Sequence, residues 1–212
     1  RSSDLMLARA RKLKDRYTVI HTEKAVSSHD KPSQALRQGK GSSMRLAIEA
    51  VAEGKAQGVV SAGNTGALMA IAKTVLKTLP GITRPAIAGP LPTMGKNDII
   101  MLDLGADVSS DPEGLFQFAV MGDAYARMEL DIRKPRIGLL NIGSEDVKGH
   151  EYLKAAHQLL RNNTISLNYI GFVEGDDIQR GEVDVVVADG FTGNIALKSI
   201  EGARRFFADQ LK

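Results

Sequence analysis

The amino-acid sequence predicts an α/β fold, a three-layer α/β/α sandwich with a mostly parallel sheet. Three observations support this prediction. Short apolar runs recur along the chain, a turn containing Gly, Asn or Asp follows each run, and a longer segment with helical periodicity follows most turns. Continuous apolar runs are typical of strands covered by helices on both faces, and alternation of strands with helices is typical of βαβ units.

The strands are predicted from the apolar runs. The clearest runs are Gly58–Val60, Ile99–Leu102, Ile137–Leu140 and Val183–Ala188, and further strands are expected at Arg84–Leu91, Ser166–Phe172 and Tyr17–His21. Three prolines fall within or directly after the 84–91 segment. Because proline cannot donate a backbone hydrogen bond, that strand is expected at a sheet edge or with irregular pairing.

The helices are predicted from apolar spacing and from their start signals. They are expected around Met44–Val51 with Ser42 or Ser43 as the cap, at Asn64–Lys77, from Pro112 onwards, at His150–Leu160 and at Thr192–Leu211. The polar segment Ser27–Lys40, which contains Pro32 and Gly39, is expected to be a connecting loop, with a mobile lid as the alternative.

The length of 212 residues suits one α/β domain, and the sequence shows neither an internal repeat nor a linker. We therefore expect a single domain spanning residues 1–212. The chain begins with Arg1 rather than Met, and it stops at Lys212 within a helical apolar stripe. A chain truncated at both ends is the expectation.

Composition excludes several classes of protein. The 28 basic and 25 acidic residues are scattered, Trp is absent and aromatic residues make up 5%, which disfavours nucleic-acid binding. The absence of Cys excludes disulfides, thiolate zinc sites and a cysteine nucleophile, and it suits a reducing cytoplasm. No apolar run approaches the ~20 residues that span a bilayer, and no secretion signal opens the chain, so we predict neither a secreted nor a transmembrane protein.

Four polar turns are expected at the carboxyl ends of strands, where open α/β sheets bind their ligands. They are Ser61–Gly66, Asp103–Asp107, Asn141–Asp146 and Asp189–Asn194. Each turn alone is also explained as a tight connection or a helix cap. Because unpaired carboxylates gathered at one edge are costly unless a charge or ligand offsets them, we interpret the four turns as one shared anion site.

The first turn leads into a helix, whose free N–H groups favour an anion. Gly63 and Gly66 permit close backbone approach, while Ser61, Asn64 and Thr65 add side-chain donors. Neither a Walker A loop nor a G-x-G-x-x-G motif occurs here, which argues against nucleotide binding and a nicotinamide oxidoreductase.

The histidines do not indicate a metal site or a hydrolase. His150 and His157 lie seven apart on one predicted helix, and His21 and His29 lie elsewhere, so no metal-binding spacing occurs. Structural or surface roles are expected for them. Ser61 lacks the G-x-S-x-G elbow of a Ser–His–Asp hydrolase.

Four strings of residues carry a resemblance to a known family. They lie at Val59–Leu68, Leu115–Gly122, Gly138–Gly143 and Asp189–Asn194. Together they resemble the bacterial phosphate acyltransferases of fatty acid and phospholipid synthesis, over nearly the whole chain. The resemblance implies a fold similar to phosphotransacetylase and to isocitrate/isopropylmalate dehydrogenase-like folds. Asp107 stands where the family usually has Asn, and the family's Gly- and Asp-rich first strand end and C-terminal Gly/His/Ser-rich segment are not in this sequence.

The resemblance also implies an activity: formation of acyl-phosphate from acyl-acyl carrier protein and inorganic phosphate, without a cofactor or a metal. It implies a cytoplasmic homodimer, with contact at the inner face of the cell membrane as an additional possibility. An acyl-CoA-dependent phosphotransacetylase and a non-catalytic phosphate- or acyl-binding module are the alternatives.

The site residues follow from the turns and from this resemblance. The catalytic candidates are Asp189, Asn194, Glu145, Lys148 and Asn141, and the substrate- or phosphate-binding candidates are Ser61, Gly63, Asn64, Thr65, Gly66, Asp103, Gly143, Thr192 and Gly193. The asparagines are the expected oxyanion or phosphate donors. Lys148 is a candidate anion partner, and Asp189 or Glu145 a candidate acid/base.

The end of the chain forms an amphipathic pattern. Phe206 and Phe207 lie beside Arg204 and Arg205, a combination that suits a helix on an anionic membrane surface. Packing of this helix in the core or in a dimer interface is the favoured interpretation.

Overall fold

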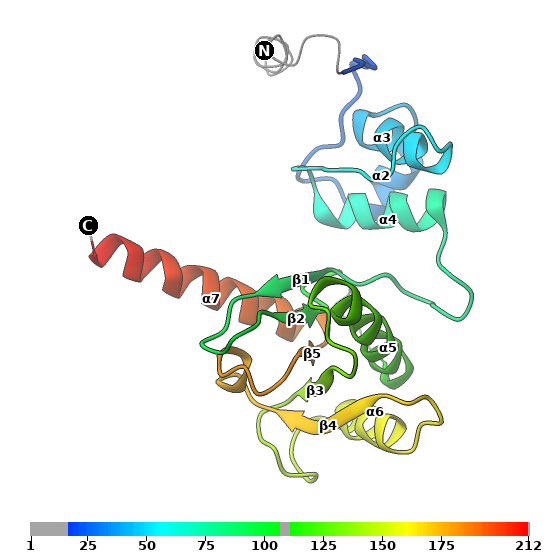
Figure 1. Ribbon diagram of the computed structural model, residues 1–212. Coiled ribbons are helices and arrows are strands. Elements are labelled where there is room, and N and C mark those ends of the chain that lie inside the picture. The colour runs from blue at the N-terminus through cyan, green and yellow to red at the C-terminus, as the bar shows by residue number, and fades with distance from the viewer. Residues whose placement is uncertain (1–16, 107–110, 212) are drawn as a thin grey trace. The chain divides into compact units, whose positions relative to one another are not determined.

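The computed structural model describes residues 17–106 and 111–211. The chain divides into two compact units, the first ending at Lys77 and the second beginning at Thr78 (Figure 1). Each unit contains a hydrophobic cluster of its own. The sequence did not indicate this division, and a single domain over residues 1–212 stays a prediction.

The first unit is helical. Its helices are α2 (Pro32–Gln38), α3 (Ser43–Ala52) and α4 (Thr65–Leu76). They enclose a small core that includes Ile48 and Ile71, both fully buried. The Ser42 side chain accepts a hydrogen bond from the Arg45 backbone N–H at 3.3 Å, so Ser42 is the cap of α3.

Three predictions in the first unit are wrong. Within the described part of this unit, neither Gly58–Val60 nor Tyr17–His21 forms a strand. Val60 is 100% exposed, so the apolar run at 58–60 is not a buried segment. The segment Ser27–Lys40 is not simply a loop, because it contains α2. Pro32 stands in the first turn of that helix, where its fixed φ suits a helix start. Ala35 is the buried residue of the same helix.

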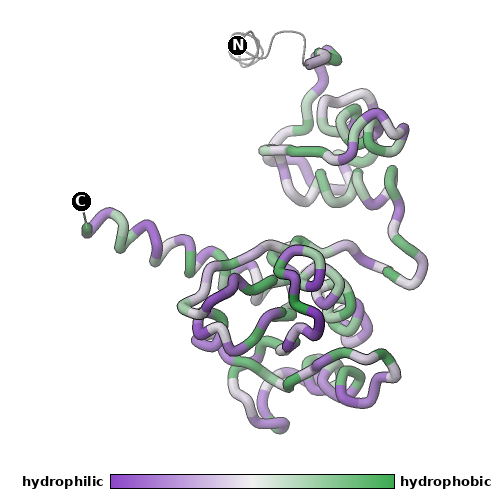
Figure 2. The backbone as a smooth tube through the Cα atoms, in the orientation of Figure 1, coloured by the Kyte–Doolittle hydropathy of each residue, from purple (hydrophilic) through white to green (hydrophobic). Residues whose placement is uncertain are grey.

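The second unit contains a five-stranded sheet. The strands are β1 (Ala88–Leu91), β2 (Ile99–Leu102), β3 (Arg136–Leu140), β4 (Asn168–Val173) and β5 (Val185–Val187). Their order is β1-β2-β5-β3-β4, and only β1 pairs antiparallel. The edge position of β1 agrees with the prediction made from the prolines of this segment, of which Pro90 lies within the strand. Apolar residues dominate the central strands β2 and β5 (Figure 2).

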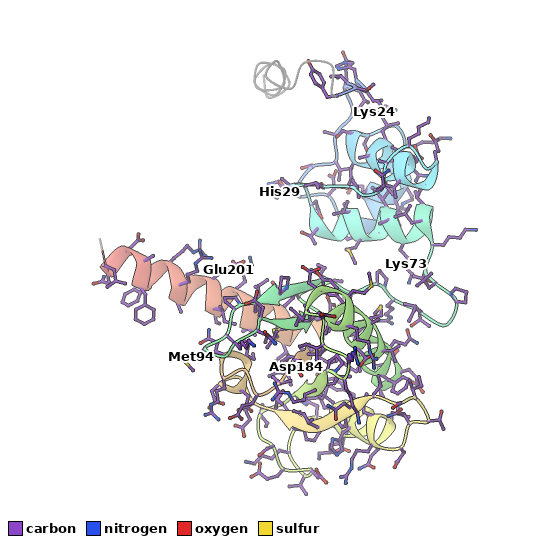
Figure 3. The ribbon with its side chains drawn as sticks, viewed as in Figure 1. Lys24, His29, Lys73, Met94, Asp184 and Glu201 are labelled. Atoms are coloured by element: carbon purple, nitrogen blue, oxygen red, sulfur yellow. The ribbon has the colours of Figure 1, made fainter. Side chains whose placement is uncertain are left out.

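An ion pair joins the amino-terminal ends of two neighbouring strands. Asp184, labelled in Figure 3, directly precedes β5. Arg136 is the first residue of β3. The Asp184 carboxylate accepts hydrogen bonds from the Arg136 backbone N–H at 2.7 Å and from its guanidinium at 2.9 and 3.0 Å. Burial opposes the charge of Asp184, but these hydrogen bonds and the positive charge of Arg136 together lower its pKa.

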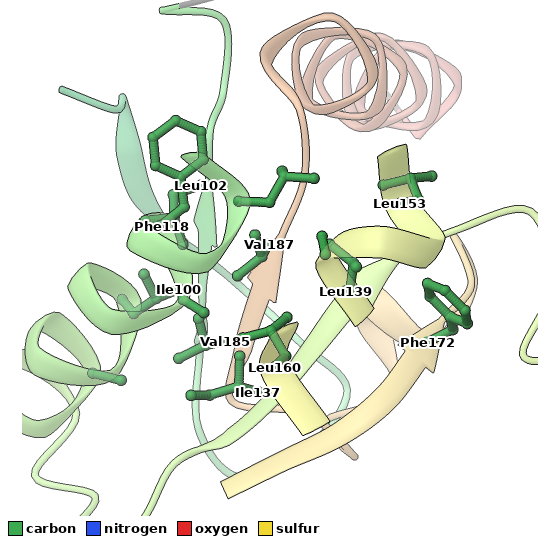
Figure 4. Packing of buried hydrophobic residues seen from close by; sticks show 14 residues of the cluster. Ile100, Leu102, Phe118, Ile137, Leu139, Leu153, Leu160, Phe172, Val185 and Val187 are labelled. Atoms are coloured by element: carbon green, nitrogen blue, oxygen red, sulfur yellow. The ribbon is translucent and has the colours of Figure 1, made fainter. Parts of the chain in front are cut away.

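Helices cover both faces of the sheet. Ile100, Leu102, Val185 and Val187 pack with α5 (Pro112–Glu129) and α6 (Glu151–Arg161) on one face (Figure 4). The alternate strand residues, among them Met101 and Val186, pack with α7 (Gly190–Gln210) and the short 3-10 helix η2 (Asp177–Gln179) on the other. This arrangement confirms the predicted three-layer α/β/α sandwich and the three helices and five strands predicted within this unit.

Candidate functional site

Three of the four polar turns follow neighbouring strands. The turns at Asp103, Asp189 and Asn141 come after β2, β5 and β3, which lie side by side in the sheet and run parallel. Because the carboxyl ends of parallel strands meet at one edge, these three turns share that edge. The sequence predicted this part of the site correctly.

The second and fourth turns are in direct contact. A Cβ atom on Gly193 would lie 1.9 Å from the carbonyl oxygen of Asp103, so only glycine fits at this approach. Gly105 has a φ of 124°, and a Cβ atom there would lie 3.3 Å from the Cβ atom of Asn194. The first turn of α7 therefore sits directly against the turn that follows β2.

Asp103 organises the backbone of its own turn. Its side chain is fully buried. Its Oδ1 atom accepts hydrogen bonds from the backbone N–H groups of Ile87 at 2.9 Å, Gly105 at 3.2 Å and Ala106 at 2.9 Å. Asp103 thus joins the turn after β2 to the segment before β1. Asp107, the other carboxylate of this turn in the sequence, lies outside the described residues.

Asp189 is the N-cap of α7. Its Oδ1 atom accepts hydrogen bonds from the backbone N–H groups of Phe191 at 3.0 Å and Thr192 at 2.9 Å. Its Oδ2 atom accepts from the Thr192 hydroxyl at 2.6 Å and from the Tyr152 hydroxyl at 3.1 Å. Four donors therefore fix the carboxylate, and the carboxylate in turn fixes Thr192.

Tyr152 is a site residue that sequence reasoning missed. It lies in the first turn of α6, and its ring stacks on His150 with 5.7 Å between the ring centroids. Burial, followed by the negative charge of Asp189 and the hydrogen bond to it, raises the pKa of Tyr152 to about 12. The hydroxyl therefore keeps its proton at neutral pH and donates a hydrogen bond to Asp189. A lone Tyr at a predicted helix start gives no signal for this role.

Asn141 closes the third turn. Its buried side chain donates from Nδ2 to the Lys148 carbonyl oxygen at 3.1 Å, and its backbone N–H donates to the Val173 carbonyl oxygen at 2.9 Å. Its Oδ1 atom has no hydrogen-bond partner among the described residues. Gly149 lies against this amide, because a Cβ atom there would be 2.1 Å from Oδ1. The loop from Asn141 to Gly149 is thereby held closed.

Lys148 and Glu145 form an ion pair across this loop, with 2.9 Å between Nζ and Oε1. The hydrogen bond from Lys148 lowers the pKa of Glu145, and the same bond raises the pKa of Lys148. Both groups are therefore charged at neutral pH. Gly143 lies beneath them, because a Cβ atom there would be 2.4 Å from Cδ of Lys148.

A cavity of about 470 Å³ lies between the third and fourth turns. Asn141, His150, Tyr152 and Thr192 contribute polar groups to its wall, and the other side chains that line it are apolar. His150 was expected to be structural or at the surface, and nothing in the sequence spacing indicated that it borders this cavity. His157, for which the same expectation was made, is buried against Phe172 and Tyr169.

The Ser61–Gly66 turn belongs to the first unit, and a non-strand segment precedes it. The prediction that all four turns follow strands is therefore wrong for this one. Asn64 is the N-cap of α4: its Oδ1 atom accepts from the Ala67 N–H at 3.0 Å, and its Nδ2 atom donates to the Asp30 carbonyl oxygen at 2.9 Å. Thr65 is the first residue of this helix.

Packing explains the small residues of the first turn. A Cβ atom on Gly63 would lie 2.9 Å from Cε of Met44, and one on Gly66 would lie 3.0 Å from Cγ of Pro32. The Ser61 hydroxyl accepts from the Gly63 N–H at 3.2 Å. Within the first unit, this turn caps α4 and holds the segment before α2. Its membership of a shared anion site stays a prediction.

The described residues contain no cluster of His, Asp and Glu side chains with the arrangement of a metal site. Within residues 17–106 and 111–211, no helix combines the length and apolarity that a membrane crossing requires.

The fold and the strand-end turns define an α/β protein of the phosphotransacetylase class of folds. A phosphotransacetylase from Streptococcus pyogenes matches with a TM-score of 0.64 at 19% identity, covering 89% of this chain and 68% of that one. The EutD phosphotransacetylase from Staphylococcus aureus matches with a TM-score of 0.58 at 19% identity, covering 91% of this chain and 69% of that one. At this identity, the likeness concerns the fold alone.

The sequence matches a specific family. The family model described as "Fatty acid synthesis protein" covers residues 2–212, and the chain belongs to that family. A phosphate acyltransferase from Paramagnetospirillum magneticum is 56% identical over 207 residues, which are 98% of this chain and 59% of the relative. One from Rhodospirillum centenum is 55% identical over 96% of this chain and 59% of its own length. The chain thus spans about three fifths of these relatives, and the resemblance stated from the sequence is confirmed.

Proposed function

We propose that the full-length protein is an enzyme that transfers an acyl group from acyl-acyl carrier protein to inorganic phosphate. The acyl-phosphate would then feed the acylation of glycerol 3-phosphate in phospholipid synthesis. One observation carries the proposal: turns rich in Gly, Asn and Asp follow β2, β5 and β3 at one sheet edge, and two of them are in contact. The name phosphate acyltransferase, carried by relatives more than half identical to this chain, supports acyl transfer to phosphate.

The proposed reaction needs no protein nucleophile. A phosphate oxygen attacks the thioester carbonyl carbon, the new C–O bond forms, and the C–S bond breaks as the thiolate leaves with its electron pair and takes up a proton. Inorganic phosphate carries at least one deprotonated oxygen at neutral pH, and a thiol of pKa ~8.5 is a fair leaving group. The protein's tasks are to align two anionic substrates and to stabilise the oxyanion.

The geometry suggests a role for each group. Asn194, at the start of α7, would donate to phosphate or the oxyanion. Thr192 and Gly193 would border the same anion, while their backbone N–H groups donate to Asp189. Lys148, whose pKa is raised by Glu145, supplies a permanent positive charge for an anion. Asn141 is a further amide of the same sheet edge, and Gly143 keeps the backbone beneath Lys148 open.

The two carboxylates differ in the role that their surroundings support. Asp189 accepts four hydrogen bonds, which suits a positioning residue for Thr192 and the helix start. Glu145 is the remaining acid/base candidate. Because its pKa is lowered, it would accept a proton rather than donate one near neutral pH. The Ser61–Gly66 turn is proposed to contact the same phosphate, and Asp103 to hold the turn that faces it.

The test is hydroxylamine trapping of acyl-phosphate made by the purified full-length protein from acyl carrier protein thioester and phosphate. Asn194→Ala should lower turnover by more than about tenfold, the scale for loss of an oxyanion donor. Lys198→Ala, on the same helix and paired only with Glu201 at the surface, is the control. Unchanged turnover in Asn194→Ala would remove this residue from the site, and no product in the wild-type protein would refute the proposed reaction.

The alternative donor is an acyl-CoA, as expected of a phosphotransacetylase. The same assay separates the two reactions. Acyl carrier protein thioesters of long chains should be used in preference to acetyl-CoA. The reverse preference would identify a phosphotransacetylase, and tight phosphate binding without turnover would identify a non-catalytic module.

We further propose that α7 contributes to a homodimer. Phe206 and Phe207 are exposed in the single chain, and their rings meet edge to face with centroids 5.5 Å apart. These two rings are therefore not buried among the described residues, although Leu197 and Ile200 of the same helix pack against the core. We propose that a partner subunit covers the rings, with the inner face of the membrane as the alternative. Phe206→Ser combined with Phe207→Ser should shift sedimentation towards monomer. Loss of flotation with anionic liposomes at unchanged sedimentation would favour the membrane instead.

A further inference from the structure

We propose that the cavity between Asn141 and Ala196 holds the acyl chain of the thioester. This inference rests on the proposed function, since it assigns a substrate part to a place beside the proposed reacting groups. The cavity measures about 470 Å³, which lies in the range of cavities that take small organic ligands.

The position of the cavity fits a chain attached to a reacting carbonyl. Asn141 and Thr192, from the third and fourth turns, border it. Thr192 is fixed by two hydrogen bonds to Asp189, at 2.6 and 2.9 Å. A carbonyl placed at this polar border would leave its alkyl chain directed along the wall formed by Ile195 and Ala196 of α7.

The chemistry of the wall selects an uncharged, apolar occupant. Besides the four polar residues, the side chains that line the cavity come from Leu140, Ile142, Leu153, Ile178, Ile195 and Ala196. None of the described residues that line it is Asp, Glu, Lys or Arg. Phosphate or a nucleotide would lose its hydration there without gaining a charged partner, whereas a methylene chain loses nothing.

The mouth of the cavity is also apolar. Ile142 and Ile195 line the cavity while 79% and 51% exposed, respectively. Single exposed apolar residues are ordinary, but these two both line one apolar cavity. A chain that enters beside them would cover apolar surface that is now exposed.

The experiment measures binding without transfer, so that it does not depend on turnover. Methyl, hexyl and decyl thioethers of pantetheine keep the arm and the chain but lack the carbonyl that phosphate attacks. Their affinity for the full-length wild-type protein is measured by calorimetry. If the cavity takes the chain, affinity rises with chain length by up to about fourfold per added methylene until the cavity is filled.

Two variants change the cavity and one serves as the control. Ala196→Phe fills the cavity. Ile195→Ser makes part of its wall polar, and because Ile195 is half-exposed the substitution does not disturb the hydrophobic core. Ser199→Phe adds the same ring to an exposed position of α7 outside the cavity. Ala196→Phe should remove most of the gain in affinity between the methyl and decyl compounds, Ile195→Ser should reduce it, and Ser199→Phe should leave it unchanged.

Three outcomes would overturn the inference. Affinity independent of chain length in the wild-type protein would show that the chain binds elsewhere. An unaltered gain in both cavity variants would do the same. If the cavity variants lowered the affinities of the methyl and decyl compounds by the same factor, the cavity would be assigned to the pantetheine arm. Absence of acyl-phosphate in the trapping assay, with chain-length-dependent binding retained, would refute the reaction and leave an acyl-binding cavity.

Discussion

Single residues at the sheet edge combine structural and chemical demands that the sequence does not separate. Asp189 was a candidate acid/base because a carboxylate at a strand end suits that role. In the fold, the same carboxylate caps α7 and accepts hydrogen bonds from the hydroxyl groups of Thr192 and Tyr152. These partners become neighbours only through the fold: Tyr152 is 37 positions away.

Asp189→Asn distinguishes positioning from proton transfer. The amide keeps an acceptor for the helix N–H groups, so the free energy of unfolding should change by less than about 1 kcal/mol, whereas Asp189→Ala should lose about 0.5–2 kcal/mol. If Asp189 positions Thr192, the asparagine variant loses turnover but keeps both apparent pKa values of the pH–rate profile. Disappearance of one limb of that profile would instead make Asp189 the acid/base.

His157 makes stability depend on pH. Burial lowers its pKa below the ordinary 6.5, although Asp146, with Oδ1 3.5 Å from Nε2, opposes the shift and Arg161 adds to it. Below pH 6.5, His157 therefore binds a proton in the unfolded chain but stays neutral in the folded protein until the pH reaches its lowered pKa. Stability is complete above pH 6.5 and falls as the pH drops towards the lowered pKa.

Urea unfolding at pH 7.5 and 5.5 tests this dependence. The wild-type midpoint should fall more than that of His157→Gln, whose side chain does not titrate. Asp184 and Glu145 do not interfere, because carboxylates with lowered pKa values lose their contribution only below about pH 4.5. Equal losses in the two proteins would contradict the role of His157.

At the scale of elements, helices were more predictable than strands. Apolar spacing and start signals located α3, α4, α6 and α7 to within two residues at both ends, and α5 at its start, because signals such as the cap Ser42 and the first-turn Pro112 are local. The run at 58–60 has the same composition as a buried strand, but a strand also needs a neighbour to pair with, which the sequence does not reveal. α2 is short and polar, so its periodicity gave no signal.

Gly193 tests the contact between α7 and the turn after β2. Gly193→Ala places a methyl group 1.9 Å from the Asp103 carbonyl oxygen, so the helix must shift, and we expect a loss of about 2 kcal/mol or more in the free energy of unfolding. Turnover should fall with it, because Asn194 moves too. Gly202→Ala on the same helix has open space and should gain about 0.5–1 kcal/mol. Equal effects at both positions would mean that this contact is unimportant.

At the scale of the whole molecule, the sequence predicted the sandwich and three of the site's turns but not the division at Lys77. Turns at the ends of parallel strands reach one edge by topology alone, which is why Asn141 and Asp189 could be assigned together. The Ser61–Gly66 turn has no strand before it, so topology does not place it at that edge. Capping of α4 and packing against Met44 and Pro32 account for its residues. Its membership of the site stays a prediction.

Tryptic cleavage at Lys77 tests that arrangement in the full-length protein. If one phosphate contacts both the Ser61–Gly66 turn and α7, its binding opposes opening between the units. Cleavage through the open state should then slow by about tenfold at a phosphate concentration of about ten times its Kd, with chloride at equal ionic strength as the reference. Lys55 is an exposed lysine within the first unit, and its cleavage reports any direct effect on the protease. Phosphate that supports turnover but leaves the rate at Lys77 unchanged would confine the anion site to the turns after β2, β3 and β5, and Asn64 would then be a helix cap alone.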